Sequence, residues 1–294
     1  FVGCSSVATV SIPSTVTSIG DNAFSGCTSL TSITMSNGTQ EIGDNAFVGC
    51  TSVSSVTIPG SVSTVGNGSF SGCTSLTSVT ITSGVEVIGD NTFKGCASIP
   101  SISIPNSVTE IGASSFSGCT SLTTVTIGSG VESIGSSAFN GCSNVSTITV
   151  EATTPPTLGS NAFDNTNNTR IDVPCSSLST YKAASGWSTY ADRVWSQPAV
   201  TGITLDKNVL QILTGVSYTL TATVVPNDAC TKDVVWSTSN SSIVTIAQDG
   251  TLTSVGYGEA VISATTVDGG LTATCAVSVA KNQGEVTVVP TVST

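Results

Sequence analysis

Cysteine is the residue type whose spacing most suggests chemistry, because seven cysteines of this 294-residue sequence recur at one interval. Thiolates bind metal ions and form disulfides, but metal sites built from Cys use closely spaced pairs such as C-x-x-C, and the chain has none. Side chains stacked one strand apart, about 4.8 Å, point the same way and do not present their Cβ atoms for disulfides. The pattern therefore favours a ladder of buried thiols over a metal or redox site. The ladder has a constant period of 23 (27 − 4, 50 − 27 and so on) and consists of Cys4, Cys27, Cys50, Cys73, Cys96, Cys119 and Cys142.

Cys230 and Cys275 lie outside the ladder, in a segment with strand-like alternation. Cys230 shares strand parity with Trp236, and Cys275 shares it with Val277, so both side chains should face one interior. We expect a disulfide between Cys230 and Cys275, which would fit an oxidising, extracellular compartment.

Other catalytic chemistry finds little support. The chain has no His, which removes the commonest general base and a common metal ligand. Glu41, Glu86, Glu110 and Glu132 recur at or near one phase, and we interpret them as solvated charges rather than as a catalytic pair. The sequence contains no Gly-rich phosphate loop, calcium loop or activated nucleophile. We expect neither an enzymatic activity nor a cofactor.

Charge and hydropathy narrow the class of protein. Lys and Arg total 7 against 18 Asp and Glu, a net charge of −11, which disfavours binding to nucleic acid. Charged residues are only 9% of the chain, so solubility must rest on Ser, Thr, Asn and Gly. The sequence has no apolar run of about 18 residues that could span a membrane. Because it opens directly on a repeat, we expect a signal peptide to lie outside this fragment.

The elements that position these residues follow from the same period. Phenylalanines from Phe1 to Phe139 recur with the period of the cysteines. Self-similarity at such a period indicates a solenoid, in which each repeat buries its apolar face against its neighbours. Within one repeat, Leu30, Ile33 and Met35 alternate as a half-buried strand does. Each repeat is therefore predicted to contribute one short parallel strand to a mainly β fold.

The remainder of each repeat should return the chain along the convex side. Gly20 and its equivalents are expected at a turn that needs a conformation only Gly adopts freely. Asp21, three residues before the core Phe24, is expected to cap a short helical turn, which Gly26 closes.

The pattern F-x-G-C-x-x-L-x-x-I-x-I-P…V-x-x-I-G-x-x-A-F, present from Phe47 to Pro59 and again from Phe93 to Pro105, resembles the BspA or Treponema type of leucine-rich repeat. The resemblance covers residues 1 to about 195. Thr39 stands where Val is expected, and Pro100 is a second departure; both concern local packing. We assign residues 1–168 to the leucine-rich-repeat solenoid.

Residues 169–197 are predicted to cap the end of the solenoid, as repeat proteins require. Leu178, Tyr181 and Ala184 fall on one helical face, and Trp187 and Tyr190 continue it.

The pattern changes after this cap. Short alternating strands and the turn Asp249-Gly250 indicate a β-sandwich over residues 198–280. Thr201-Gly-Ile-Thr-Leu205 and Gly269-Gly-Leu-Thr-Ala-Thr-Cys-Ala-Val-Ser-Val279 resemble the group 2 bacterial Ig-like domain. Residues 281–294 are expected to form a tail or linker.

The outward strand positions of the repeats are uniformly hydroxylic. They could simply keep a parallel sheet soluble and bond one another across strands, or they could form a broad polar docking surface. A carbohydrate cleft is less favoured because these positions hold no aromatic residue, and an ice-binding array is disfavoured by the mixture of Ser with Thr. The candidate binding face comprises Ser32, Thr34, Ser55, Thr57, Ser78, Thr80, Ser101, Ser103, Thr124, Thr126, Thr147 and Thr149, with Thr9 and Ser11 in the first repeat.

The resemblance implies adhesion, because proteins of the BspA type bind matrix components such as fibronectin and fibrinogen, and group 2 Ig-like domains occur in bacterial adhesins. We therefore expect a monomeric, secreted or surface-attached protein whose partners are host extracellular-matrix or surface proteins, or glycans. The alternatives are a structural spacer and a carbohydrate-binding accessory region of a larger surface protein.

Overall fold

The computed structural model describes residues 1–166, 169–198, 200–227 and 229–281. The chain divides into two compact units, Phe1–Trp195 and Ser196–Thr294. Apart from Lys281, the predicted tail lies outside the described residues.

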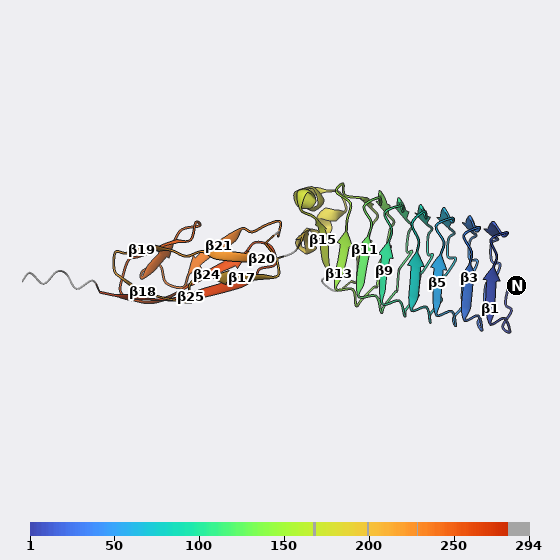
Figure 1. Cartoon of the computed structure of the whole chain (residues 1–294), viewed down its shortest axis with the longest axis horizontal. Helices are drawn as coiled ribbons and strands as arrows, with labels where there is room; N and C mark the ends of the chain where they lie inside the picture. The colour runs from blue at the N-terminus through green and yellow to red at the C-terminus, as the bar shows by residue number, and fades with distance from the viewer. Residues whose placement is uncertain (167–168, 199, 228, 282–294) are drawn as a thin grey trace, which may run out of the picture. The chain divides into compact units, whose positions relative to one another are not determined.

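The first unit is the predicted parallel-strand solenoid (Figure 1). Each strand residue pairs with its equivalent in the next repeat, so that Val10 lies beside Ile33 and Val56 beside Val79. One strand comes from each repeat, at β1 Thr9–Ile12, β3 Ser32–Met35, β5 Ser55–Ile58, β7 Ser78–Ile81, β9 Ser101–Ile104, β11 Thr124–Ile127 and β13 Thr147–Val150, followed by β15 Arg170–Pro174 and β16 Val194–Gln197.

This row of strands is interrupted once. It forms two sheets, β1-β3-β5-β7 and β16-β15-β13-β11-β9, although residues 1–166 are described without a gap. At the position before each strand, the N–H normally bonds the carbonyl of the equivalent residue in the preceding repeat, as Thr77 does to Ser54. Pro100 occupies that position before β9 and has no N–H to donate to Thr77. Pro100, which departs from the repeat pattern, therefore lies at the break between β7 and β9.

A second parallel sheet runs continuously along the other side of the solenoid. It has the order β14-β12-β10-β8-β6-β4-β2, and each strand is a residue pair. Its members are β2 Ser18–Ile19, β4 Glu41–Ile42, β6 Thr64–Val65, β8 Val87–Ile88, β10 Glu110–Ile111, β12 Ser133–Ile134 and β14 Thr157–Leu158.

The core between the two sheets is built from ladders of identical side chains. The rings of the repeated phenylalanines stack with centroids 5.2–5.7 Å apart from Phe1 to Phe163. The predicted thiol ladder is confirmed: from Cys27 to Cys142 the side chains are buried and free. Each thiol donates to the carbonyl of the Phe of the preceding repeat, as Cys50 does to Phe24 over 3.1 Å. Burial raises the pKa of Cys50 from 9.0 to about 11, so this thiol stays protonated and unreactive.

The segment that follows each short strand and contains the core Phe differs from the prediction. Successive turns replace the helical turn, since Ser25 N bonds Asn22 O over 3.0 Å and Cys27 N bonds Phe24 O over 3.2 Å. Asp21 does not cap its own repeat, because its Oδ1 accepts the N–H of Asp44 in the next repeat over 2.8 Å.

The glycine that begins each of these turns is also explained differently. Gly43 has no positive φ, but a Cβ there would lie 2.7 Å from the backbone nitrogen of Asp21. Close approach of successive repeats, rather than backbone conformation, therefore requires Gly at this position. The left-handed positions in the turn are Asn22 (φ 56°) and Gly26 (φ 70°), of which Gly26 agrees with the prediction.

Three short helices follow the repeats: η1 Cys175–Ser177, α1 Leu178–Ala183 and η2 Trp187–Arg193. Tyr181 and Trp187 are fully buried and join the core of the repeats. Their polar atoms donate to carbonyls of the last repeat, Tyr181 OH to Ala152 over 2.8 Å and Trp187 Nε1 to Pro156 over 2.7 Å. These bonds satisfy the polar groups that burial removes from water.

The second unit is a β-sandwich with a separate core around Trp236, Ile262 and Val277. Its sheets have the orders β18-β25-β24-β21, β19-β23-β22 and β17-β20. The strands are β17 Gly202–Leu205, β18 Val209–Leu213, β19 Ser217–Thr219, β20 Ala222–Val225, β21 Val234–Thr238, β22 Val244–Ile246, β23 Thr251–Ser254, β24 Gly258–Thr266 and β25 Thr272–Ala280.

The predicted Cys230–Cys275 disulfide is wrong. Cys275 is a free, fully buried thiol in β25, opposite Ile262 of β24. Cys230 is disulfide-bonded, as is Cys175 in η1. The prediction extended the alternation of strand side chains from Trp236 back to Cys230. It failed because Cys230 lies outside β21, in a segment without strand geometry.

Candidate binding surface

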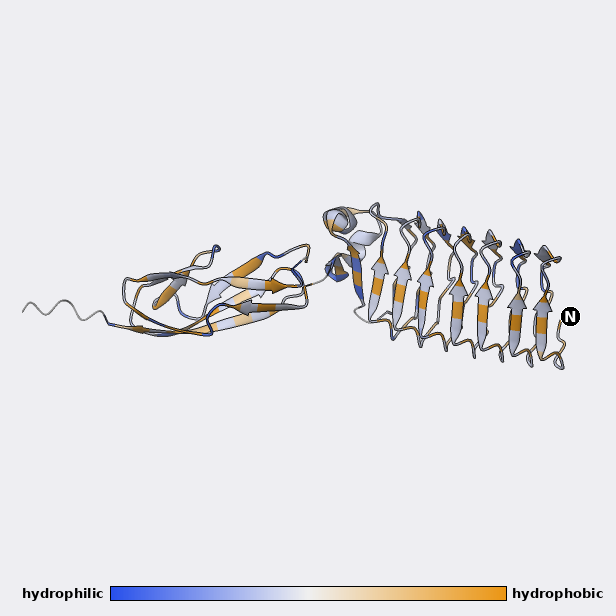
Figure 2. Ribbon diagram, viewed as in Figure 1, coloured by the Kyte–Doolittle hydropathy of each residue, from blue (hydrophilic) through white to orange (hydrophobic). Residues whose placement is uncertain are grey.

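The candidate surface is the outward face of the longer strands, β1 to β13, of the solenoid. Along each strand, buried aliphatic side chains alternate with outward Ser or Thr, which Figure 2 shows as orange bands on pale arrows. The parallel register aligns the outward residues in two rows, with Ser55 beside Ser78 and Thr57 beside Thr80. We call these two rows the hydroxyl face; it comprises Thr9, Ser11 and the twelve candidate residues named from the sequence.

Exposure changes along this face. The side chains are exposed from β1 to β9 and at Thr124, whereas Thr126, Thr147 and Thr149 are half-buried. The face is therefore most accessible over the first five repeats, and the break between β7 and β9 falls within that accessible part.

The hydroxyls of the face form no hydrogen bond with any residue that the structure describes. They do not bond one another across strands, as one interpretation of the sequence supposed. The adjacent hydroxyls behave differently, since Thr31, Thr77 and Thr123 each donate to a carbonyl of the preceding repeat over 2.9–3.1 Å. The hydroxyl face thus offers unused donors and acceptors to water or to a ligand, while the row beside it fastens the repeats together.

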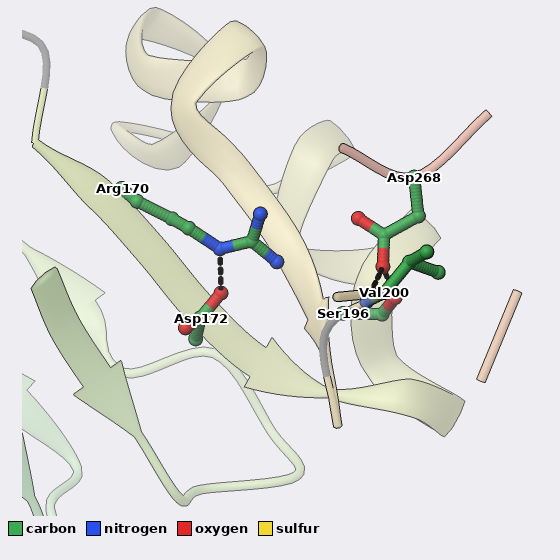
Figure 3. A network of polar contacts seen from close by, with 5 residues as sticks. All are labelled: Arg170, Asp172, Ser196, Val200 and Asp268. Carbon is green, nitrogen blue, oxygen red and sulfur yellow. Dashed lines mark hydrogen bonds and ion pairs between the residues drawn. The ribbon is translucent and has the colours of Figure 1, made fainter. Parts of the chain in front are cut away.

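The two rows end in an ion pair that the sequence reasoning did not include. Arg170 and Asp172 of β15 take the register positions beside Thr147 and Thr149. Arg170 Nε lies 2.6 Å from Asp172 Oδ1 (Figure 3). Continuing the repeat period from Thr147 and Thr149 to β15 would have found both residues.

An aromatic side chain accompanies this ion pair. The guanidinium carbon of Arg170 lies 5.2 Å from the centroid of the Trp195 ring, and Lys182 Nζ lies 5.7 Å from it. Charged and aromatic groups therefore gather at the end of a face that otherwise carries only hydroxyls.

Within the described ranges, no three His, Cys, Asp or Glu side chains are grouped so that they could hold a metal ion. The structure as described also holds no helix with the length and apolar character that a membrane crossing needs.

The described part of the unit that begins at Ser196 contains a buried polar cluster around Asp268. Asp268 Oδ2 accepts the hydroxyl of Ser196 and the N–H of Val200, each over 3.2 Å (Figure 3). Both bonds close the beginning of the sandwich onto its last turn, which is a structural role.

Comparison with known families gives two matches. The BspA type leucine-rich-repeat region matches in six copies over residues 1–122 and 86–214. The group 2 bacterial Ig-like domain matches residues 199–277.

Among individual proteins, the chain is 41% identical over 91 residues to an uncharacterized protein of Clostridium acetobutylicum, covering 31% of this chain and 23% of that protein. It is 44% identical over 81 residues to an α-L-arabinofuranosidase of Bifidobacterium longum, covering 28% of this chain and 8% of the enzyme. The chain thus spans less than a quarter of the length of these two relatives.

Among solved structures, a leucine-rich-repeat protein of T. pallidum is 28% identical with a TM-score of 0.48, over 52% of this chain and 73% of the other. A leucine-rich-repeat protein of Eubacterium ventriosum is 26% identical with a TM-score of 0.48, over 54% and 43% of the two chains.

Proposed function

The chain belongs to the BspA-type leucine-rich-repeat family and carries a group 2 bacterial Ig-like domain, and from this premise we propose that it is a non-enzymatic adhesion protein acting outside the cell or at its surface. It binds an extended segment of a host extracellular-matrix or surface protein along the hydroxyl face. The Ig-like domain holds the solenoid away from the surface or adds a second contact.

One observation carries this proposal: fourteen outward Ser and Thr side chains, aligned across seven strands, make no hydrogen bond to the rest of the described protein. A partner lying across the strands meets the same pair of groups at every repeat, about 4.8 Å apart. Such a surface favours many weak, similar hydrogen bonds over one specific pocket, as suits a long and repetitive partner.

Two features support a site outside the cell. Cys175 and Cys230 are disulfide-bonded, and disulfides persist in oxidising compartments. The other eight cysteines are thiols, of which seven are buried, so oxidation outside the cell would leave most of them untouched.

The experiment measures binding of the full chain to immobilised fibronectin and fibrinogen by surface plasmon resonance, with serum albumin as the reference surface. Saturable binding to either matrix protein, and none to albumin, is the expected result. Failure to bind either protein contradicts the matrix-binding assignment for this part of the protein.

A carbohydrate-related role is the second candidate, favoured by the match to an α-L-arabinofuranosidase over 81 residues. In that role the chain would be an accessory region that keeps an enzyme close to a glycan. Binding to arabinan but to neither matrix protein would support this role and contradict the first one.

A further inference from the structure

The sheet β18-β25-β24-β21 of the sandwich has two edge strands, and the structure treats them differently. At β21 the side-chain amide of Gln248 lies along the edge. Its Oε1 accepts the N–H of Trp236 and its Nε2 donates to the carbonyl of Trp236, each over 3.1 Å. A side chain thus occupies the position that another strand would take beside the middle of β21.

Among the residues that the structure describes, none covers the opposite edge, β18, in this way. Ala276 N donates to Asn208 O over 2.9 Å, and Thr214 N donates to Ala280 O over 3.0 Å, so even-numbered residues of this segment face β25. Because backbone groups alternate along a strand, those of Val209, Gln211 and Leu213 face outward. In the described part of the chain, nothing bonds their three N–H groups or the carbonyls of Val209 and Gln211.

The side chains of β18 are also incompletely covered. Val209 is 64% exposed and Leu213 is 45% exposed, while Leu210 and Ile212 face the core but remain half-buried. Proteins protect edge strands with charges, Pro, bulges or covering segments. Residues 208–216, which read NVLQILTGV, hold no charge and no Pro.

We propose that β18 pairs with β18 of a second copy of the chain, antiparallel about a two-fold axis through Gln211. In this register Gln211 lies opposite Gln211 of the second copy, Val209 opposite Leu213, and Leu210 opposite Ile212. The two Gln211 residues then form a hydrogen-bonded pair, and each Leu213 N–H donates to the Val209 carbonyl of the other copy, while the Leu213 carbonyl keeps its bonds to Val216 N and Ser254 Oγ. The half-buried side chains extend the core across the interface.

The absence of charge in residues 208–216 allows this occupant. A net charge of −11 on each copy opposes association, so two copies can meet only through a segment without acidic residues. In the proposed register, Lys207 lies opposite Gly215 and Asp206 opposite Val216, so no like charges face each other. Strands as short as β18 bury less than the roughly 1,200 Å² of a stable interface, so the association is weak and needs concentrated protein.

The test is sedimentation equilibrium of the full chain over a wide concentration range. A monomer–dimer equilibrium is expected, and both Gln211→Lys and Gln211→Glu should weaken it at least tenfold, because each places like charges at the two-fold axis. An equimolar mixture of the two variants should recover the association, since Lys then faces Glu. The matched control is Ser237→Lys, which adds the same charge on the exposed face of the other edge strand, β21, and should leave the equilibrium unchanged.

A second variant keeps the test independent of side-chain charge. Gln211→Pro removes one outward N–H but no bond to β25, so the fold should survive while dimerisation falls. Near-ultraviolet circular dichroism checks that each variant is folded. A wild-type chain that stays monomeric at every concentration, a Gln211→Lys chain that associates like wild type, or a mixture that fails to recover association each overturns the proposal. Slow amide exchange at Gln211 in a monomer would also overturn it, because another segment of the same chain then covers β18.

Discussion

The ring stack of the solenoid makes a quantitative prediction for Phe93→Ala. Phe93 is fully buried, with its centroid 5.5 Å from that of Phe70 and 5.3 Å from that of Phe116. Replacing a buried Phe by Ala costs about 3–5 kcal/mol, of which each lost ring pair accounts for about 0.5–1.5 kcal/mol. The free energy of unfolding of the solenoid should therefore fall by about 3–5 kcal/mol.

The control is the same substitution at the start of the stack. Phe1 is 74% exposed and contacts one ring, that of Phe24, at 5.3 Å. Phe1→Ala should therefore cost about 1 kcal/mol or less. Urea unfolding followed by far-ultraviolet circular dichroism measures both losses.

The comparison between the two variants decides the matter. Equal losses for Phe93→Ala and Phe1→Ala would refute the claim that stacking of buried rings between repeats stabilises the solenoid. A smaller dependence of the unfolding free energy on urea concentration for Phe93→Ala would show that the repeats on either side of residue 93 unfold separately, as nearest-neighbour coupling allows.

Two other predictions concern polar ladders. Asp44→Ala removes the acceptor of Asn67 N, 2.7 Å away, and should lower the free energy of unfolding in urea by about 0.5–1.5 kcal/mol. Asp44→Asn should be nearly neutral, because an Asn at the equivalent position of the next repeat, Asn67, accepts a backbone N–H through its Oδ1. Equal losses for the two variants would contradict this role. Burial raises the pKa of Cys50 from 9.0 to about 11 and that of Cys96 to about 12, so the folded state keeps protons that the unfolded state loses. Stability should then fall as pH rises from about 9 to about 11, by at most about 1.4 kcal/mol per pH unit for each thiol, and Cys96→Ala should reduce that slope in urea titrations at several pH values. An unchanged slope would contradict the assignment.

The repeat period predicted most of the solenoid, because each residue type recurs in a fixed environment. Phe, Cys and the strand aliphatics occupy the core as expected, and even the irregular Thr39 is buried, with its hydroxyl 3.4 Å from the carbonyl of Val16. The alternation within each strand also predicted which side chains point outward.

The errors arose where a role depends on the neighbouring repeat rather than on the local sequence. Asp21 has the spacing of a helix cap, yet its acceptor oxygen serves a backbone N–H of the next repeat. Pro100 lies where the sheet is interrupted, and what it removes there is a donor to the carbonyl of Thr77 in the preceding repeat. Strand parity placed Cys275 in the sandwich interior correctly, but parity does not reveal which sulfur atoms meet in space.

The central claim is that the hydroxyl face binds the partner, and one measurement tests it most directly. The full chain with Thr57→Arg and Thr80→Arg is compared with the full chain with Thr17→Arg and Thr64→Arg. All four residues are exposed, and each variant gains two positive charges, but only the first variant places them on the hydroxyl face. Affinity for immobilised fibronectin or fibrinogen, whichever binds the wild type, is measured by surface plasmon resonance. We predict at least a tenfold loss, about 1.4 kcal/mol, for the first pair and less than a twofold change for the second. Equal affinities for the two double variants would contradict the claim.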